Sequence, residues 1–259
     1  RQRQMCIRDR NMINGLSEID IFKVVRPVID GCELDSHDFP IIQAPTLDSI
    51  DWENIYPINY QNLSPKNDNS NAVALMFRYD KELLALWNNP LKRVPLFQGC
   101  MAVCTPDFSV YPSMNSNEIR HNIYMARWLG CTWQNYGCTV IPTIGWATPC
   151  TYDLCFAGVE EGCPVAISTI GCRAHQDVFL EGFEEMKRRI KPSVILVYGD
   201  MINGMAGKFI HFRYEDAFSK SGIQLRMNNV SQVCIIKEAV EWDLEGLLWM
   251  LTIAIFLLL

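Results

Sequence analysis

Short apolar runs alternate with amphipathic segments through the middle of the chain. Five runs have the length of a buried strand: Ala72–Phe77, Cys100–Cys104, Thr139–Ile144, Val165–Thr169 and Val194–Tyr198. Three segments between them repeat apolar residues at helical spacing: Tyr79–Trp87, Asn117–Leu129 and Asp177–Ile190. Because strands that are apolar on both faces are typical of parallel sheets covered by helices, the pattern predicts an α/β fold of repeated strand–helix units.

The ends of the longer helices are marked by local signals. Ser116 is a candidate N-cap for the second helix, and Gly130 stands just past its expected end. The third helix is followed by Pro192, which cannot continue it. Its apolar residues are expected to point inward, and they are Phe179, Phe183, Met186 and Ile190.

This order of elements predicts a mostly parallel sheet, either open or partly closed like a barrel. Five units are too few for an eight-stranded barrel unless residues 11–70 and 205–235 supply further strands. Right-handed crossovers place the carboxyl ends of all the strands at one edge, where ligands bind in folds of this class. A functional site is therefore expected at that edge.

Four regions are expected along the chain. Residues 1–11 form an extension, 12–71 an irregular N-terminal region that packs on the core, 72–204 the α/β core, and 205–259 a divergent tail with an apolar C-terminal helix. Several prolines interrupt the N-terminal region, and the polar run at 64–71 separates it from the core.

The opening RQRQMCIRDR has neither periodicity nor turn signals. It resembles the translated adaptor sequence found at the ends of metagenomic genes, and Met12 is then the natural start. The alternative interpretation is a basic arm that binds nucleic acid.

The other end of the chain is apolar from Leu247 to Leu259 except for Thr252. Thirteen residues that rise about 1.5 Å each fall short of a hydrocarbon core roughly 30 Å thick. Acidic rather than basic residues flank the run. We expect a helix packed on the domain; a truncated or frame-shifted end and a membrane tail are the alternatives.

Charge and cysteine content narrow the class of protein. The net charge is −6, and the first ten residues hold four arginines and one aspartate, so the remainder carries −9. An acidic body disfavours non-specific binding to nucleic acid, although a small nucleotide can still be held by a few groups. Eleven cysteines without a signal peptide indicate reduced thiols in a cytoplasmic protein.

Polar residues near the ends of the expected strands are the candidates for catalysis. Asp107 follows the second strand, Asp153 follows the third after a loop, and Ser168 lies at the end of the fourth. Asp107 and Asp153 together would form a carboxylate pair for metal binding or acid–base chemistry. Each has an alternative structural role, since Asp after Pro106 readily caps a turn, and Ser168 is not in a nucleophile-elbow context.

Five further residues are candidates for substrate binding. Arg127 and Gln134 would hold an anion or an amide, and Trp146 would stack on a base or a sugar. Tyr198 and Gly199 end the fifth strand, where the glycine suits a turn with positive φ or a close ligand approach. The usual phosphate-loop, dinucleotide and zinc signatures are missing, so the sequence specifies no cofactor, although a divalent metal is compatible.

Six segments in order resemble the domain-of-unknown-function 4417 family, which occurs in bacteria and their phages. They are TPDFSVY from Thr105, YMARWLGCTWQNYG from Tyr124, VIPTIGW from Val140, YDLCFAGV from Tyr152, VAISTIG from Val165 and ILVYG from Ile195. The family pattern carries Tyr-Arg-x-Arg in the second segment, where this chain has Met125 in place of the first arginine. The resemblance implies a phage, prophage or mobile-element setting and supplies no activity.

Two functions from different classes are compatible with these patterns. The first is an enzyme, a hydrolase or transferase that acts on a nucleotide or a nucleic-acid end at the strand-end edge. The alternative is a non-enzymatic protein that binds a phage or host partner. A polar pocket at the strand ends would favour the enzyme.

Overall fold

The structure, a computed structural model, describes residues 26–46 and 49–214. It has a mixed α/β fold in which all strands are parallel, and the predicted fold class is confirmed to that extent. One sheet has the order β1-β2-β3-β4 and the other β5-β6-β7, so neighbours in space follow the order of the chain. The strand bounds are Tyr56–Asn59, Ala72–Leu75, Ala102–Cys104, Val140–Ile141, Val165–Ser168, Ile195–Tyr198 and Phe209–Phe212.

The two sheets meet where the chain leaves β4. Thr143 forms an isolated parallel bridge with Ala166 of β5. The Ala166 N–H donates to the carbonyl of Pro142 at 2.9 Å, and the Ile144 N–H donates to that of Ala166 at 2.8 Å. The described strands form two sheets joined by this bridge, and the expected barrel-like closure is not found among them.

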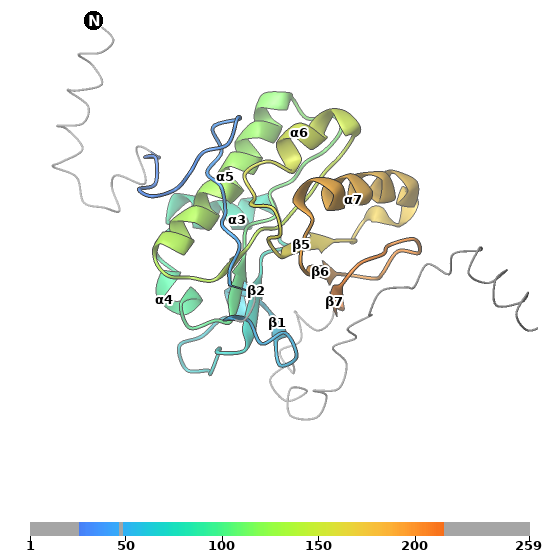
Figure 1. Cartoon of the computed structure of the whole chain (residues 1–259). Coiled ribbons are helices and arrows are strands. Elements are labelled where there is room, and N and C mark those ends of the chain that lie inside the picture. Colours follow the sequence, from blue (N-terminus) through green and yellow to red (C-terminus); the bar gives the residue numbers. More distant parts are fainter. Residues whose placement is uncertain (1–25, 47–48, 215–259) are drawn as a thin grey trace, which may run out of the picture.

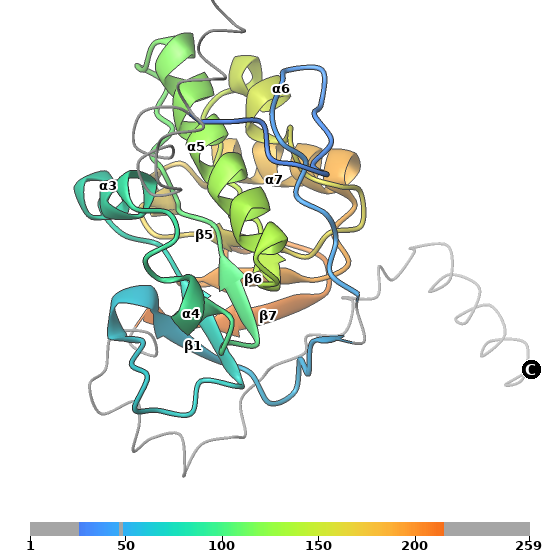
Figure 2. The ribbon, with the colours of Figure 1, turned by 90° about the vertical axis from the view of Figure 1, so that its left-hand side faces the viewer.

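Helices cover one side of these sheets (Figure 1). The longer ones are α3 (Asp80–Asn88), α5 (Ser116–Asn135) and α7 (Gln176–Ile190), which confirm the three predicted helices, and α4 (Val94–Phe97) and α6 (Tyr152–Cys155) are single turns. Figure 2 shows α5 passing in front of the strands, with α3 to one side and α6 above. The inward residues predicted for α7 are all buried.

Alternate residues of each strand enter different cores. In β2, Ala72 and Ala74 pack beneath α3 and α5, and Ile195 of β6 packs beneath α7. Val73 and Leu75 point the other way, into a third cluster that also receives side chains from β3 to β7. Burial on both faces explains the uninterrupted apolar runs in the sequence.

Four sequence-based expectations differ from the structure in detail. β1 lies within the N-terminal region that was expected to be irregular, and β7 lies in the expected tail. β4 is shorter than the predicted strand because Pro142 has no N–H and Thr143 turns to bond Thr105 instead. The N-cap of α5 is Asn115, which forms a capping box with Glu118, rather than Ser116.

Gly130 lies inside α5 and does not end it. A Cβ at this position would come within 2.6 Å of Ile42 Cδ1 and 2.8 Å of Thr105 Cγ2. The helix therefore continues past the expected end, and the glycine lets it approach the end of β3 closely.

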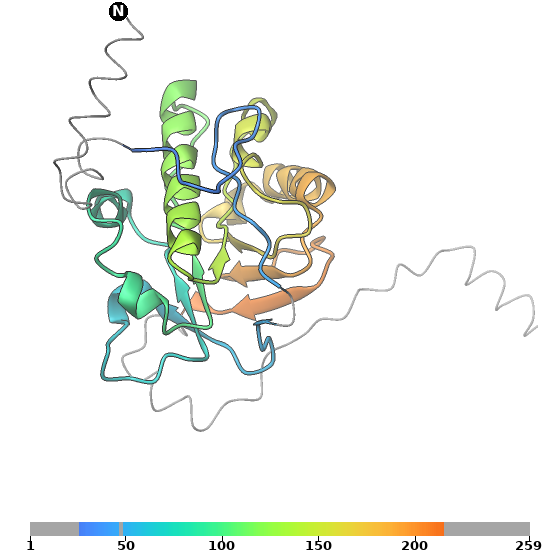
Figure 3. The same cartoon turned by 60° about the vertical axis from the view of Figure 1, so that its left-hand side comes forward.

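Residues 26–46 run along α5 and reach the region of α6 (Figure 3). Ile42 pairs with Val159 in a parallel bridge, and the Arg120 side chain donates to the carbonyl of His37 at 3.2 Å. The expected extension at residues 1–11 and the expected apolar helix at the C-terminus lie outside the described residues. In the part of the chain that the structure describes, no helix has the length and apolarity to cross a membrane.

Candidate functional site

Asp107 lies in the loop that follows β3, at the edge where the strands end. Its backbone N–H donates to the carbonyl of Met76 at 3.4 Å, which ties this loop to the end of β2. No described residue donates a hydrogen bond to its half-buried carboxylate. Burial, with a smaller contribution from Asp80, raises the pKa of Asp107 to about 7.

Asp80, the first residue of α3, is the second carboxylate at this edge. It accepts hydrogen bonds from the backbone N–H of Ser109 at 3.1 Å and from the Ser109 hydroxyl at 3.0 Å. These bonds join the loops after β2 and β3 and fix a negative charge near Asp107. Asp80 was not among the residues expected at the site, because the contact between the two loops has no signature in the sequence.

Arg127 projects from the middle of α5 and is only 2% exposed. Its guanidinium donates to three backbone carbonyls: Ala157 at 2.8 Å, Thr143 at 3.2 Å and Cys155 at 2.9 Å. Burial lowers the pKa of Arg127 to about 10, which leaves it charged at neutral pH. The side chain thus connects α5 to the end of β4 and to the α6 segment.

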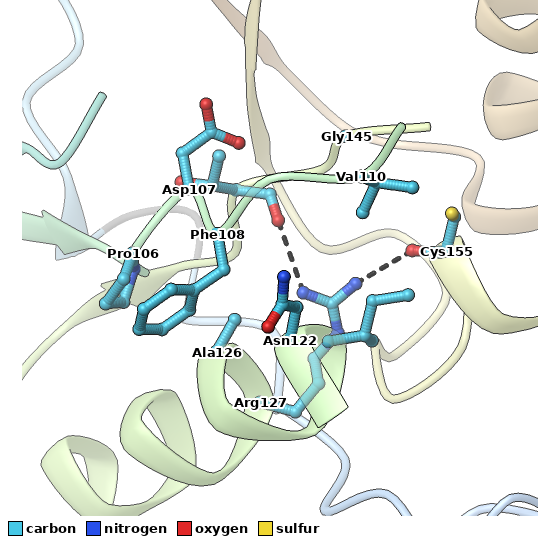
Figure 4. A pocket seen from close by; sticks show the side chains of 11 residues that line it. Pro106, Asp107, Phe108, Val110, Asn122, Ala126, Arg127, Gly145 and Cys155 are labelled. Carbon is cyan, nitrogen blue, oxygen red and sulfur yellow. Dashed lines mark hydrogen bonds between the residues drawn. The ribbon is translucent and has the colours of Figure 1, made fainter. Parts of the chain in front are cut away.

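A small cavity of about 20 Å³ lies between these elements, enough for a water molecule. Its lining includes Asp107, Arg127, Asn122, Gly145 and apolar side chains such as Phe108. Figure 4 shows the Asp107 carboxylate pointing away from the guanidinium, and the two groups form no ion pair.

The other expected catalytic residues lie apart from this cavity. Asp153 is on α6, its side chain is 75% exposed, and it pairs with Arg189 of α7 at 2.7 Å. Ser168 ends β5, and its hydroxyl accepts a hydrogen bond from the Ile170 N–H at 3.2 Å. The carboxylate found near Asp107 is therefore Asp80 and not Asp153.

Two of the expected substrate-binding residues make contacts within the protein. Gln134 is near the C-terminal end of α5, where its amide exchanges hydrogen bonds of 2.7 and 3.1 Å with the backbone of Gln43. Trp146 packs on Phe179, with ring centroids 5.0 Å apart, and leaves no room for a Cβ on Gly182. These contacts hold the N-terminal segment and α7 in place.

Tyr198 and Gly199 end β6 in the interior of the protein. The Tyr198 ring is 2% exposed and stacks on Phe77 at a centroid distance of 4.9 Å. Gly199 has a φ of +107°, and a Cβ there would come within 2.6 Å of the Thr169 hydroxyl. The predicted turn with positive φ is confirmed.

Metal ligands are not grouped within residues 26–46 and 49–214. No three His, Cys, Asp or Glu side chains lie close enough together in these ranges to hold an ion. Asp80 and Asp107 are two neighbouring carboxylates at the edge for which the sequence was compatible with a divalent metal.

Comparison with known proteins shows a family match and a similarity to phage proteins. The sequence model of a family described as "Domain of unknown function (DUF4417)" matches residues 37–215. The "Gene 1 protein" of Mycobacterium phage D29 is 40% identical over 133 residues, which cover 50% of this chain and 49% of that protein. The "Gene 1 protein" of Mycobacterium phage L5 is 38% identical over 135 residues, covering 51% and 59%. The chain thus spans about half the length of these curated relatives, and no solved structure matches it.

Proposed function

Because the chain belongs to the DUF4417 family and is similar to phage proteins, we propose that it is a cytoplasmic, phage-associated enzyme with its site at the strand ends. The reaction is a hydrolysis or group transfer on a nucleotide or a nucleic-acid end. Asp107 transfers a proton to or from the substrate.

The burial of the Asp107 carboxyl group, which has no described hydrogen-bond donor, is the observation that supports this proposal. A carboxyl group with a pKa of about 7 is protonated in part of the molecules at neutral pH, and it can act as an acid or as a base. Groups with such shifts are concentrated in active sites, because burial of a carboxylate without a partner destabilises the fold. The location at the ends of parallel strands also favours a site, by analogy with folds of this class.

Neighbouring residues have separate roles in this proposal. Asp80, held by Ser109, keeps the Asp107 proton affinity high through its negative charge. A divalent metal remains compatible, since Mg²⁺ is commonly bound by one or two carboxylates, water and substrate phosphates. Asp153 and Ser168 lie outside the cavity, so the proton transfer is assigned to Asp107 alone.

One observation favours the alternative, a protein that binds a phage or host partner without catalysis. Tyr79 and Tyr111 follow β2 and β3 at the same edge, and their exposed fractions are 73% and 58%. Exposed tyrosines are enriched in protein interfaces. Under this alternative, replacement of both by Ser abolishes partner binding, and replacement of Asp107 has no effect.

The enzyme proposal is tested with the full chain against nucleoside phosphates and short single-stranded oligonucleotides, with Mg²⁺ and with a chelator. Asp107→Asn removes the titrating group with little change in shape and is expected to lower kcat by about 10²- to 10⁴-fold. Asp153→Asn is the matched control, because this aspartate is exposed and lies outside the cavity. Equal activity of the two variants, or no turnover of any substrate by the wild type, would falsify the proposal.

A further inference from the structure

The cavity beside Asp107 contains a buried positive charge that forms no ion pair with a described residue. Arg127 takes part in none of the ion pairs between described residues, and its three hydrogen bonds all go to neutral carbonyls. The Asp35 carboxylate helps to keep the Arg127 pKa up but forms no bond with it. A buried cation in this situation is stabilised by any anion that reaches it.

Several residues that line the same cavity have N–H groups without an acceptor among the described residues. A guanidinium has five N–H donors, and three of those of Arg127 are engaged. The backbone N–H groups of Phe108, Val110 and Gly145, all lining residues, donate to no described residue. Asn122 uses one of its two amide N–H bonds, to the carbonyl of Ser109 at 2.8 Å.

The acceptors beside the Arg127 guanidinium are already in use. The Thr143 and Cys155 carbonyls already accept from Arg127, and the Asp107 carboxylate points away from the guanidinium (Figure 4). Buried backbone N–H groups are nearly always paired in native proteins. Phe108 is buried and Val110 and Gly145 are half-buried, so a group from outside the protein is expected to accept here. The combination of surplus donors and an unpaired cation selects an anion over a neutral acceptor.

We propose that this cavity binds an anionic oxygen of a phosphoryl or carboxylate group, held by Arg127, Asn122 and the backbone N–H groups of its walls. A volume of about 20 Å³ admits the tip of such a group and not a whole phosphate, so the rest of the ligand lies outside, towards the strand ends. The inference rests on the proposed function, because it names the chemical class of the substrate at that site.

The test uses the full chain and small probes at constant ionic strength. Inorganic phosphate and acetate are titrated by calorimetry, and the unfolding temperature is followed at each concentration, since a ligand that binds only the native state raises it. Chloride is titrated in the same way. We expect saturable binding of phosphate, acetate or both, with a rise in Tm, and weaker binding of chloride.

Asn122→Asp places a carboxylate in the cavity beside Arg127 with almost no change in volume. We expect this variant to remain folded and to lose at least about tenfold in affinity for the oxyanion, because the site then contains its own counter-charge. Asn117→Asp is the matched control, since it makes the same change at an exposed position of the same helix, and it should bind like the wild type. Arg127→Lys keeps the charge without the fork of donors and should also bind more weakly.

Three results would overturn the inference: no binding of phosphate or acetate to the wild type, chloride binding as strong as theirs, or unchanged affinity in Asn122→Asp. The two proposals fail separately. Oxyanion binding without turnover of any substrate contradicts only the enzyme, and Asp107-dependent turnover without oxyanion binding contradicts only the anion site.

Discussion

Burial acts on both ionisable groups beside the cavity, and the consequence differs between them. For Asp107 it brings the pKa to about 7, so the group changes charge near neutral pH. For Arg127 it lowers the pKa to about 10, and the side chain stays charged because three carbonyls solvate it. The aspartate is therefore suited to proton transfer, and the arginine to a fixed charge and to support of the fold.

The raised pKa of Asp107 predicts a particular dependence of stability on pH. The folded state keeps a proton that the unfolded state has lost between pH 3.8 and about 7, so the free energy of unfolding falls as pH rises through this window. The shift corresponds to at most about 4 kcal/mol, less what the remaining solvent contact screens. Asp107→Asn should therefore be more stable than the wild type at pH 8 and nearly equal at pH 4.

Urea unfolding at several pH values measures this difference. Asp153→Asn serves again as the control and should follow the wild type across the range. A difference between Asp107→Asn and the wild type that does not grow with pH would show that Asp107 titrates normally.

Arg127→Met should destabilise the fold by roughly 3–5 kcal/mol, because three carbonyls, two of them in buried hydrogen bonds, lose their donor. Arg120→Met on the same helix removes one exposed bond to His37 and should cost less than about 1 kcal/mol. Denaturant unfolding of both variants gives the comparison. Similar losses would mean that the Arg127 bonds contribute little.

At the scale of the elements, close approach of backbone and side chains determines where helices and strands end. α5 continues through Gly130, and only a residue without a Cβ leaves room there for the side chains of Ile42 and Thr105. The three longer helices and most strands were predictable, since their apolar spacing reflects which faces are buried. The ends of α5 and β4 were not predictable from the sequence. They depend on the contacts that Gly130 and Thr143 make with residues distant in sequence.

Gly130→Ala tests the packing role of this glycine. Alanine favours a helix by about 1 kcal/mol over glycine, yet the overlap with Ile42 and Thr105 should give a net loss of about 1–3 kcal/mol. At Gly99 the nearest atom to a Cβ would be 3.5 Å away, so Gly99→Ala should be close to neutral. A stabilised Gly130→Ala variant, measured by thermal or denaturant unfolding, would mean that α5 shifts without cost.

For the molecule as a whole, the two sheets share an apolar cluster that joins β2 to β7. The sequence predicted parallel strands and the edge that carries Asp107, because both follow from the order of apolar runs. The sequence did not predict the ion pair of Asp153 with Arg189 or the hydrogen bonds of Gln134 with the backbone of Gln43. Both depend on how segments distant in sequence pack together.

The cysteines report on the integrity of this packing. All nine described cysteines are free thiols, and burial raises the pKa of Cys100 to about 12 and that of Cys138 to about 11. We expect Cys150, which is exposed, to react with a thiol reagent within the native state, and buried Cys104 and Cys131 to react only on unfolding. Peptide mapping after labelling measures each site, and Cys150→Ser should remove one fast-reacting thiol. Fast labelling of Cys104 would show that the core opens.

The sequential strand order has a consequence for how such proteins diverge. Each loop at the carboxyl edge follows one strand. The buried side chains of that strand, which enter the clusters on both faces of the sheet, hold the loop in place. A recombination event that replaces the segment after β2, β3 or β5 therefore alters one wall of the edge and leaves the remaining walls intact. This architecture therefore allows the edge to change one loop at a time.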